Sequence, residues 1–149
     1  MKREIKPLTT EDIIQLEFAG TQQNVTELLD NWSKSNRLDL AIHSIYLDFV
    51  FLLLYTASLA LGSLTFPSFT GKNNLMNWGM RFYRFSLYAG LADFFENLCL
   101  MKLLNGARNS FYPAAAWALA LIKFTVVIAV LVFLFRCILQ WAVGRVRRD

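Results

Sequence analysis

The sequence predicts an all-α protein, namely a transmembrane helical bundle with three spans and an N-terminal amphipathic helical hairpin. Of its 149 residues 56% are hydrophobic, and the mean hydropathy is +0.39. Soluble domains are about 45–50% apolar. The apolar excess is concentrated after residue 37. We therefore expect two domains, a polar interfacial hairpin over residues 1–37 and a membrane bundle over residues 38–149.

The polar N-terminal region contains signals for two short helices. Thr9 or Thr10 is expected to cap a helix over residues 11–19, which Gly20 ends. A second helix is expected over residues 21–32, with its apolar side chains on one stripe. Both are too short and too charged to span a membrane. They are predicted to lie at the membrane interface, or alternatively to form a lid over one mouth of the bundle.

Three long apolar stretches are predicted as the spans, over residues 40–63, 78–104 and 113–141. The first two are separated by residues 66–74, where proline, glycine and an asparagine pair predict a loop. Pro113 suits the first turn of the third helix. At 1.5 Å per residue the third stretch reaches roughly 45 Å, which exceeds a hydrocarbon thickness of about 30 Å. It is therefore expected to tilt or to project beyond the bilayer.

Composition and motifs disfavour several classes of function. The net charge is +4, but the basic residues flank the apolar stretches instead of forming one stripe, so nucleic acid is not an expected partner. Cys99 and Cys137 lie inside apolar segments without metal-ligand spacing and are interpreted as buried thiols. The sequence has no phosphate loop, dinucleotide fingerprint or nucleophile–base pair. We expect no cofactor, no metal, no cleavable signal peptide and no enzymatic activity of its own.

The most informative polar residues are Asp93, Glu96 and Asn97, near the middle of the second predicted span. Their spacing of i, i+3 and i+4 places them on one helix face, about one turn apart. Carboxylates in the hydrocarbon core are costly, so this face is expected to meet partners instead of lipid.

Depth along the spans predicts that these residues join a polar layer. At 1.5 Å per residue, Asp48 lies roughly 6 Å to the N-terminal side of the first span's centre, and Lys123 has a similar offset in the third. The second span is antiparallel, and Glu96 is displaced toward its C-terminus, which brings it to the same level. The residues expected in or beside this layer are Asp48, Asp93, Glu96, Asn97, Lys123, His43, Tyr46 and Tyr55.

Several roles for this layer stay open. It could fix the register of the helices, bind a small ligand, a lipid headgroup or a cation, or couple protons or ions in an oligomeric transporter. A membrane-embedded enzyme acting on lipid through Asp93 or Glu96 is a further alternative. A metal site of His43, Asp93 and Glu96 is disfavoured, because the Glu-x-x-His pairing of di-metal bundles is absent. We favour a non-enzymatic binding protein whose partners are the lipid bilayer and either a second copy or another membrane subunit.

Three motifs carry a resemblance to a known group of proteins. They are Leu-Glu-Phe-Ala-Gly-Thr at residues 16–21, Leu-Asp-Phe-Val-Phe-Leu at 47–52 followed by Tyr55, and Leu-Ala-Asp-Phe-Phe-Glu-Asn at 91–97. Together they resemble a family of small, uncharacterised bacterial integral membrane proteins with LDFxFLxxY and LADxxEN transmembrane motifs. The resemblance covers most of residues 13–130 and implies a multi-pass protein of the bacterial inner membrane. It transfers no activity. The bias of the basic flanks favours a cytoplasmic C-terminus.

Overall fold

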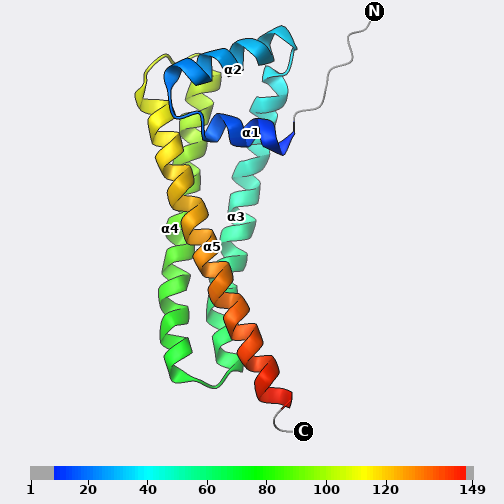
Figure 1. The fold of residues 1–149 in the computed structure, drawn as a ribbon, viewed down its shortest axis with the longest axis vertical. Coiled ribbons are helices and arrows are strands. Elements are labelled where there is room, and N and C mark those ends of the chain that lie inside the picture. Colours follow the sequence, from blue (N-terminus) through cyan, green and yellow to red (C-terminus); the bar gives the residue numbers. More distant parts are fainter. Residues whose placement is uncertain (1–8, 147–149) are drawn as a thin grey trace, which may run out of the picture. The chain divides into compact units, whose positions relative to one another are not determined.

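The computed structural model describes residues 9–146, and within this range the chain forms five α-helices and no strand (Figure 1). The helices are α1 Thr10–Glu17, α2 Gln22–Lys34, α3 Leu38–Phe69, α4 Asn73–Leu104 and α5 Phe111–Val146. The prediction of an all-helical protein is confirmed. Two helices are long and apolar enough to cross a membrane, α3 and the Phe111–Arg145 part of α5.

The long helix α4 is not among the helices that are apolar enough to cross a membrane. It contains five charged side chains, Arg81, Arg84, Asp93, Glu96 and Lys102. These charges lower its mean hydropathy, although its 32 residues equal α3 in length. The crossing of the membrane by α4, and with it the arrangement of three spans plus a hairpin, stays a prediction.

The chain divides into two compact units that do not follow the order of the sequence. The first unit comprises Met1–Phe51 and Ala92–Leu121, and the second comprises Leu52–Leu91 and Ile122–Asp149. Each long helix contributes to both units, whereas α1 and α2 belong to the first. The predicted boundary at residue 37, which is a change in sequence polarity, stays a prediction.

Local side-chain chemistry determines where α1 and α2 begin. Thr9 is the N-cap of α1: its hydroxyl accepts a hydrogen bond from the Asp12 backbone N–H at 3.3 Å, and the Asp12 carboxylate accepts one from the Thr9 backbone N–H at 2.8 Å. This reciprocal pair is a capping box. Thr21 caps α2 in the same manner, accepting from the backbone N–H of Asn24. The predicted starts at Thr9 and Thr21 are confirmed.

Within the first unit, the short helices pack onto the long ones through an apolar core (Figure 1). Trp32 is only 2% exposed. Gly20, with a φ of +66°, forms the turn between α1 and α2 beside the indole of Trp117 on α5. The buried members of this core are Leu16, Val25, Trp32, Ala41, Ile45, Leu100, Leu103 and Ala116. The N-terminal helices therefore share a core with α3, α4 and α5 instead of lying apart from them.

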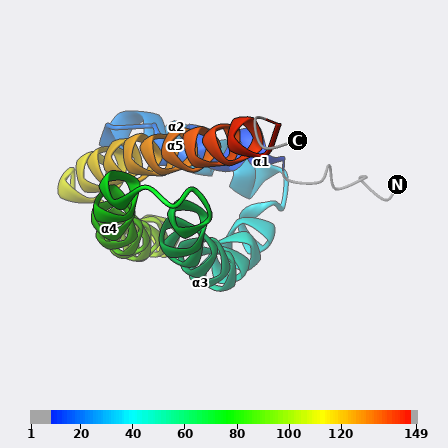
Figure 2. The same cartoon turned by 90° about the horizontal axis from the view of Figure 1, so that it is seen from below.

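The predicted loop over residues 66–74 is wrong at both ends. Helix α3 continues to Phe69 and α4 begins at Asn73, so only a short turn joins them (Figure 2). Proline is tolerated here because Pro67 lies near the C-terminal end of α3, where its missing N–H interrupts only one backbone hydrogen bond. Gly71, with a φ of +66°, then supplies the left-handed conformation that the turn requires.

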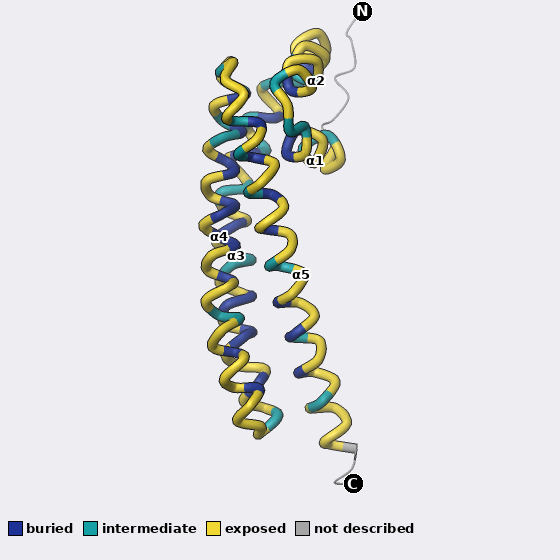
Figure 3. The backbone as a smooth tube through the Cα atoms, turned by 60° about the vertical axis from the view of Figure 1, so that its left-hand side comes forward, coloured by how far each residue is buried: buried dark blue, intermediate teal, exposed yellow. Residues whose placement is uncertain are grey.

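Buried and exposed residues alternate along the three long helices (Figure 3). In the most apolar 18-residue windows, only 28% of α3 and 22% of the α5 segment are buried. Many large apolar side chains on these helices are exposed, including Leu47, Leu53 and Val132. On α4, Ser86, Asp93, Glu96 and Asn97 are buried, whereas the cations Arg81, Arg84 and Lys102 are exposed.

Candidate functional site

The three central polar residues of α4 lie on one buried face of the first unit. Glu96 has no exposed surface, while Asn97 is 1% and Asp93 2% exposed. Leu91, Phe95 and Leu98, which neighbour them along the helix, are exposed. The helix therefore turns its carboxylates inward and its apolar side chains outward, as the i, i+3, i+4 spacing predicts.

A hydrogen bond joins this face of α4 to α3. The amide nitrogen of Asn97 donates to a carboxylate oxygen of Asp48 at 2.6 Å, and Asp48 is half-buried. One turn from this contact, the rings of Phe49 and Phe94 pack edge to face, with centroids 5.6 Å apart. We call Asp48, Asp93, Glu96 and Asn97 the acidic cluster. It contains three carboxylates on two helices of one unit.

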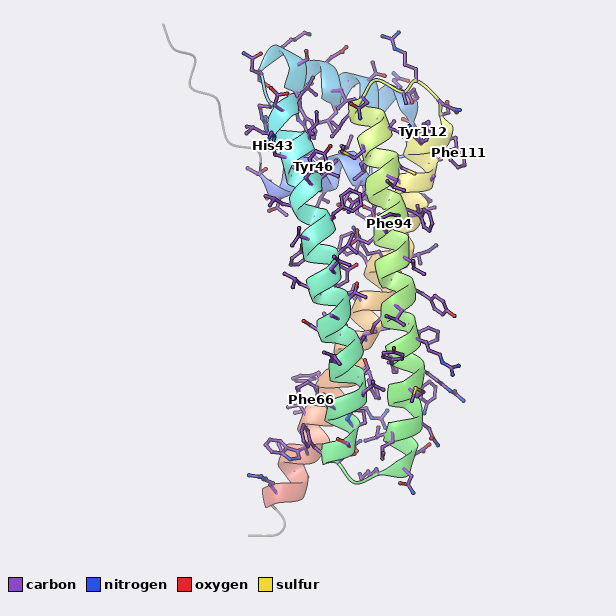
Figure 4. All side chains as sticks on the ribbon, turned by 180° about the vertical axis from the view of Figure 1, so that it is seen from behind. His43, Tyr46, Phe66, Phe94, Phe111 and Tyr112 are labelled. Atoms are coloured by element: carbon purple, nitrogen blue, oxygen red, sulfur yellow. The ribbon has the colours of Figure 1, made fainter. Side chains whose placement is uncertain are left out.

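Two other predicted members of the polar layer, His43 and Tyr46, are exposed residues of α3. His43 is exposed near the α1–α2 end of α3, and its Nδ1 lies 2.7 Å from the carbonyl oxygen of Asp39 one turn earlier (Figure 4). Tyr46 is 57% exposed on the same part of α3. Tyr55 is half-buried and belongs to the second unit. His43 and Tyr46 are thus surface residues of the first unit.

Lys123 is 7% exposed and also belongs to the second unit. Its ammonium group lies 4.8 Å from the centre of the Phe124 ring, a cation–π contact. The predicted convergence of Lys123 with Asp48 and Glu96 stays a prediction.

Sequence reasoning overlooked one buried acid in the first unit. Glu17, the last residue of α1, is only 6% exposed. Glu17 directly follows Leu16, which is 1% exposed. The spacing i, i+3, i+4, i+7 of one helix face is found at Ile13, Leu16, Glu17 and Gly20. That spacing was a signal that Glu17 points inward, although the helix is too short for a strong amphipathic pattern.

The chemistry available to the acidic cluster follows from its functional groups. Ionised carboxylates only accept hydrogen bonds, whereas the Asn97 amide both donates and accepts. Among the described residues, no group of three or more histidine, cysteine, aspartate or glutamate side chains is arranged to hold a metal ion. The arrangement suits a group with N–H or O–H donors, such as an ammonium.

Comparison of the chain with known protein families, curated proteins and solved structures found no match. The resemblance to small bacterial membrane proteins through the motifs at residues 47–52 and 91–97 stays a prediction.

Proposed function

We propose that this chain is a non-enzymatic integral membrane protein whose acidic cluster binds a donor-bearing group of a small ligand, a lipid or a partner membrane subunit. The observation that carries the proposal is the inverted polarity of α4: Asp93 and Glu96 are buried while neighbouring apolar side chains are exposed. A protein surrounded by lipid favours this arrangement, because carboxylates are costly in hydrocarbon and apolar side chains are not.

The low burial of α3 and α5 supports the membrane location. The core helix of a soluble protein is mostly buried, whereas the apolar windows of these helices are 28% and 22% buried. Their exposed apolar side chains need lipid or another apolar partner. We further propose that α4 crosses with them as a third span, that α1 and α2 form the N-terminal hairpin, and that the protein lies in the bacterial inner membrane with a cytoplasmic C-terminus.

Asp48 is the member of the acidic cluster through which an occupant would first make contact. It is half-buried, whereas Asp93, Glu96 and Asn97 are almost fully enclosed. Even if Lys123 neutralises one carboxylate, as the depth of the spans predicts, the remaining carboxylates favour a cationic or hydrogen-bond-donating group.

Native mass spectrometry of the full chain purified in mild detergent tests the proposal. We expect the protein to retain an additional mass, from a ligand, a lipid or a subunit, that Asp48→Asn loses. Asp39→Asn is the matched control, because Asp39 is an exposed acid in the first turn of the same helix. Equal retention by Asp48→Asn would contradict a binding role and leave the cluster with a structural one.

A second candidate is an oligomeric proton- or ion-coupled transporter. The observation that favours it is the difference in exposure between Glu96, which is fully buried, and Asp48, which is half-buried. Carboxylates at successive depths are characteristic of proton relays in membrane proteins. A transporter should move protons into liposomes under a pH gradient and lose that activity in folded Glu96→Gln protein. Absence of proton flux in the unmodified protein would exclude proton coupling.

A further inference from the structure

The second unit contains a groove of about 400 Å³ between the beginning of α4 and the C-terminal half of α5. This volume lies within the roughly 300–1,000 Å³ typical of small-molecule sites. Lys72 and Arg136 line it, and the Lys72 ammonium donates a hydrogen bond to the side-chain oxygen of Gln140 at 3.1 Å. The hydrogen bond holds the lysine head at the α5 side of the groove.

Aromatic side chains form the apolar part of the groove. Phe82 of α4 and Phe133 of α5 stack with their centroids 4.4 Å apart, and both line the groove. Trp78, one turn before Phe82, lines it as well and is 45% exposed. The groove therefore combines two cationic heads with an aromatic wall, which is the composition expected for a ligand with an anionic head and an apolar body.

The charge distribution of the chain favours an anion in this groove. Every aspartate and glutamate in the described range belongs to the first unit, and the second unit has none between residues 52–91 or 122–146. Among the described residues of their own unit, Lys72 and Arg136 therefore have no carboxylate to pair with. The N-terminus of α4, which begins at Asn73 directly after Lys72, adds the positive end of a helix dipole.

We propose that this groove binds the phosphate headgroup of an anionic phospholipid, with Lys72 and Arg136 contacting the phosphate and the aromatic wall contacting the acyl chains. The inference rests on the membrane location proposed above and is independent of the acidic cluster. Anionic lipids attract basic residues near a membrane surface. The exposed cation Arg81 lies 4.8 Å from the Trp78 ring, and tryptophan is enriched at membrane interfaces.

Tryptophan quenching by brominated lipids tests this inference on the full chain in nanodiscs. The Trp78 signal is obtained as the difference between the unmodified chain and Trp78→Phe. We expect brominated phosphatidylglycerol to quench this signal more strongly than brominated phosphatidylcholine. Lys72→Gln and Arg136→Gln should each lower the preference by roughly fivefold, the factor for one basic residue near an anionic surface.

Arg84→Gln is the matched control, because Arg84 is an exposed cation on α4 that does not line the groove. Lys72→Arg with Arg136→Lys should keep the preference, which separates loss of charge from loss of folding. Equal quenching by both lipids, an equal effect of Arg84→Gln, or displacement of the lipid by millimolar inorganic phosphate would overturn the inference. Failure of the chain to enter nanodiscs would contradict the proposed membrane location itself.

Discussion

At the scale of single residues, Gly79 allows α3 and α4 to approach closely within the second unit. A Cβ added to Gly79 would lie 2.4 Å from the carbonyl oxygen of Ser63 and 2.8 Å from the ring of Pro67. Pro67 has no N–H, so the Ser63 carbonyl four residues earlier lacks its usual helical donor. A Cα–H of glycine can approach this carbonyl as a weak donor, which no larger residue permits.

Gly79→Ala should therefore destabilise the protein. Its new methyl group meets backbone, which cannot rotate away, and overpacking of this kind costs about 1–3 kcal/mol. Gly144→Ala is the control, because Gly144 is a helical glycine with no atom within 4 Å of its added Cβ. There the better helix propensity of alanine should stabilise by up to about 1 kcal/mol. Unfolding in mixed detergent micelles measures both, and equal stabilities would contradict the close contact.

Gly90 of α4 also lies very close to α3. Gly90 follows Ser86 by four residues on the polar face of α4, and this pattern predicts close approach of a neighbouring helix. The structure places Thr56 there, with its hydroxyl oxygen 2.5 Å from an added Cβ. The close contact of Gly79 could not be predicted in the same way. Its partner is the Ser63 carbonyl, which lacks its helical donor because of Pro67, and Pro67 lies in a region predicted as a loop.

At the scale of elements, α1 is held at its start by short-range polar contacts. Thr9 and Asp12 form the capping box, and Arg37 forms an ion pair with Asp12 from the link between α2 and α3. The hydrogen bond from the Thr9 backbone N–H is the main cause that lowers the pKa of Asp12 below its ordinary value of 3.8. The Thr9 hydroxyl and Arg37 lower it further, and burial partly opposes them.

We expect Asp12 to stabilise α1 only while it is ionised. Because its pKa is lower in the folded than in the unfolded state, the contribution is complete above about pH 4 and is lost as the pH falls through the folded pKa. Carbon-13 NMR of the Asp12 carboxyl group should show a midpoint below 3.8 in the folded protein. Arg37→Gln should move that midpoint upward. An unchanged midpoint on denaturation would contradict this account of the cap.

At the scale of the whole molecule, the described acids are confined to the first unit, whereas basic residues occur in both, the first unit carrying Lys34, Arg37, Lys102 and Arg108. The second unit carries Lys72, Arg81, Arg84, Lys123, Arg136 and Arg145. If the bundle has three spans, the α3–α4 turn lies on the same side as the C-terminus. Basic residues favour the cytoplasmic side, so this arrangement predicts a cytoplasmic α3–α4 turn.

Cysteine labelling in intact cells tests this arrangement. Ser110→Cys, in the exposed link between α4 and α5, should react with a membrane-impermeant maleimide, whereas Asn73→Cys beside the α3–α4 turn should react only after lysis. The natural Cys137 is buried and Cys99 half-buried, so a strain with the unmodified protein sets the background. Labelling of both new cysteines in intact cells would show that α4 does not cross.

The sequence alone determined the features that depend on neighbours within one or two helical turns. These are the helical class, the caps at Thr9 and Thr21, and the common face of Asp93, Glu96 and Asn97. Depth along the spans predicted that Asp48 and Asn97 lie in one layer, and the tertiary structure decided that their side chains are hydrogen-bonded to each other. The tertiary structure also decided the burial of Glu17 and the groove beside Lys72. The physical reason is that capping and periodicity act locally along the chain, whereas contacts between helices depend on their relative rotation and height, which packing sets.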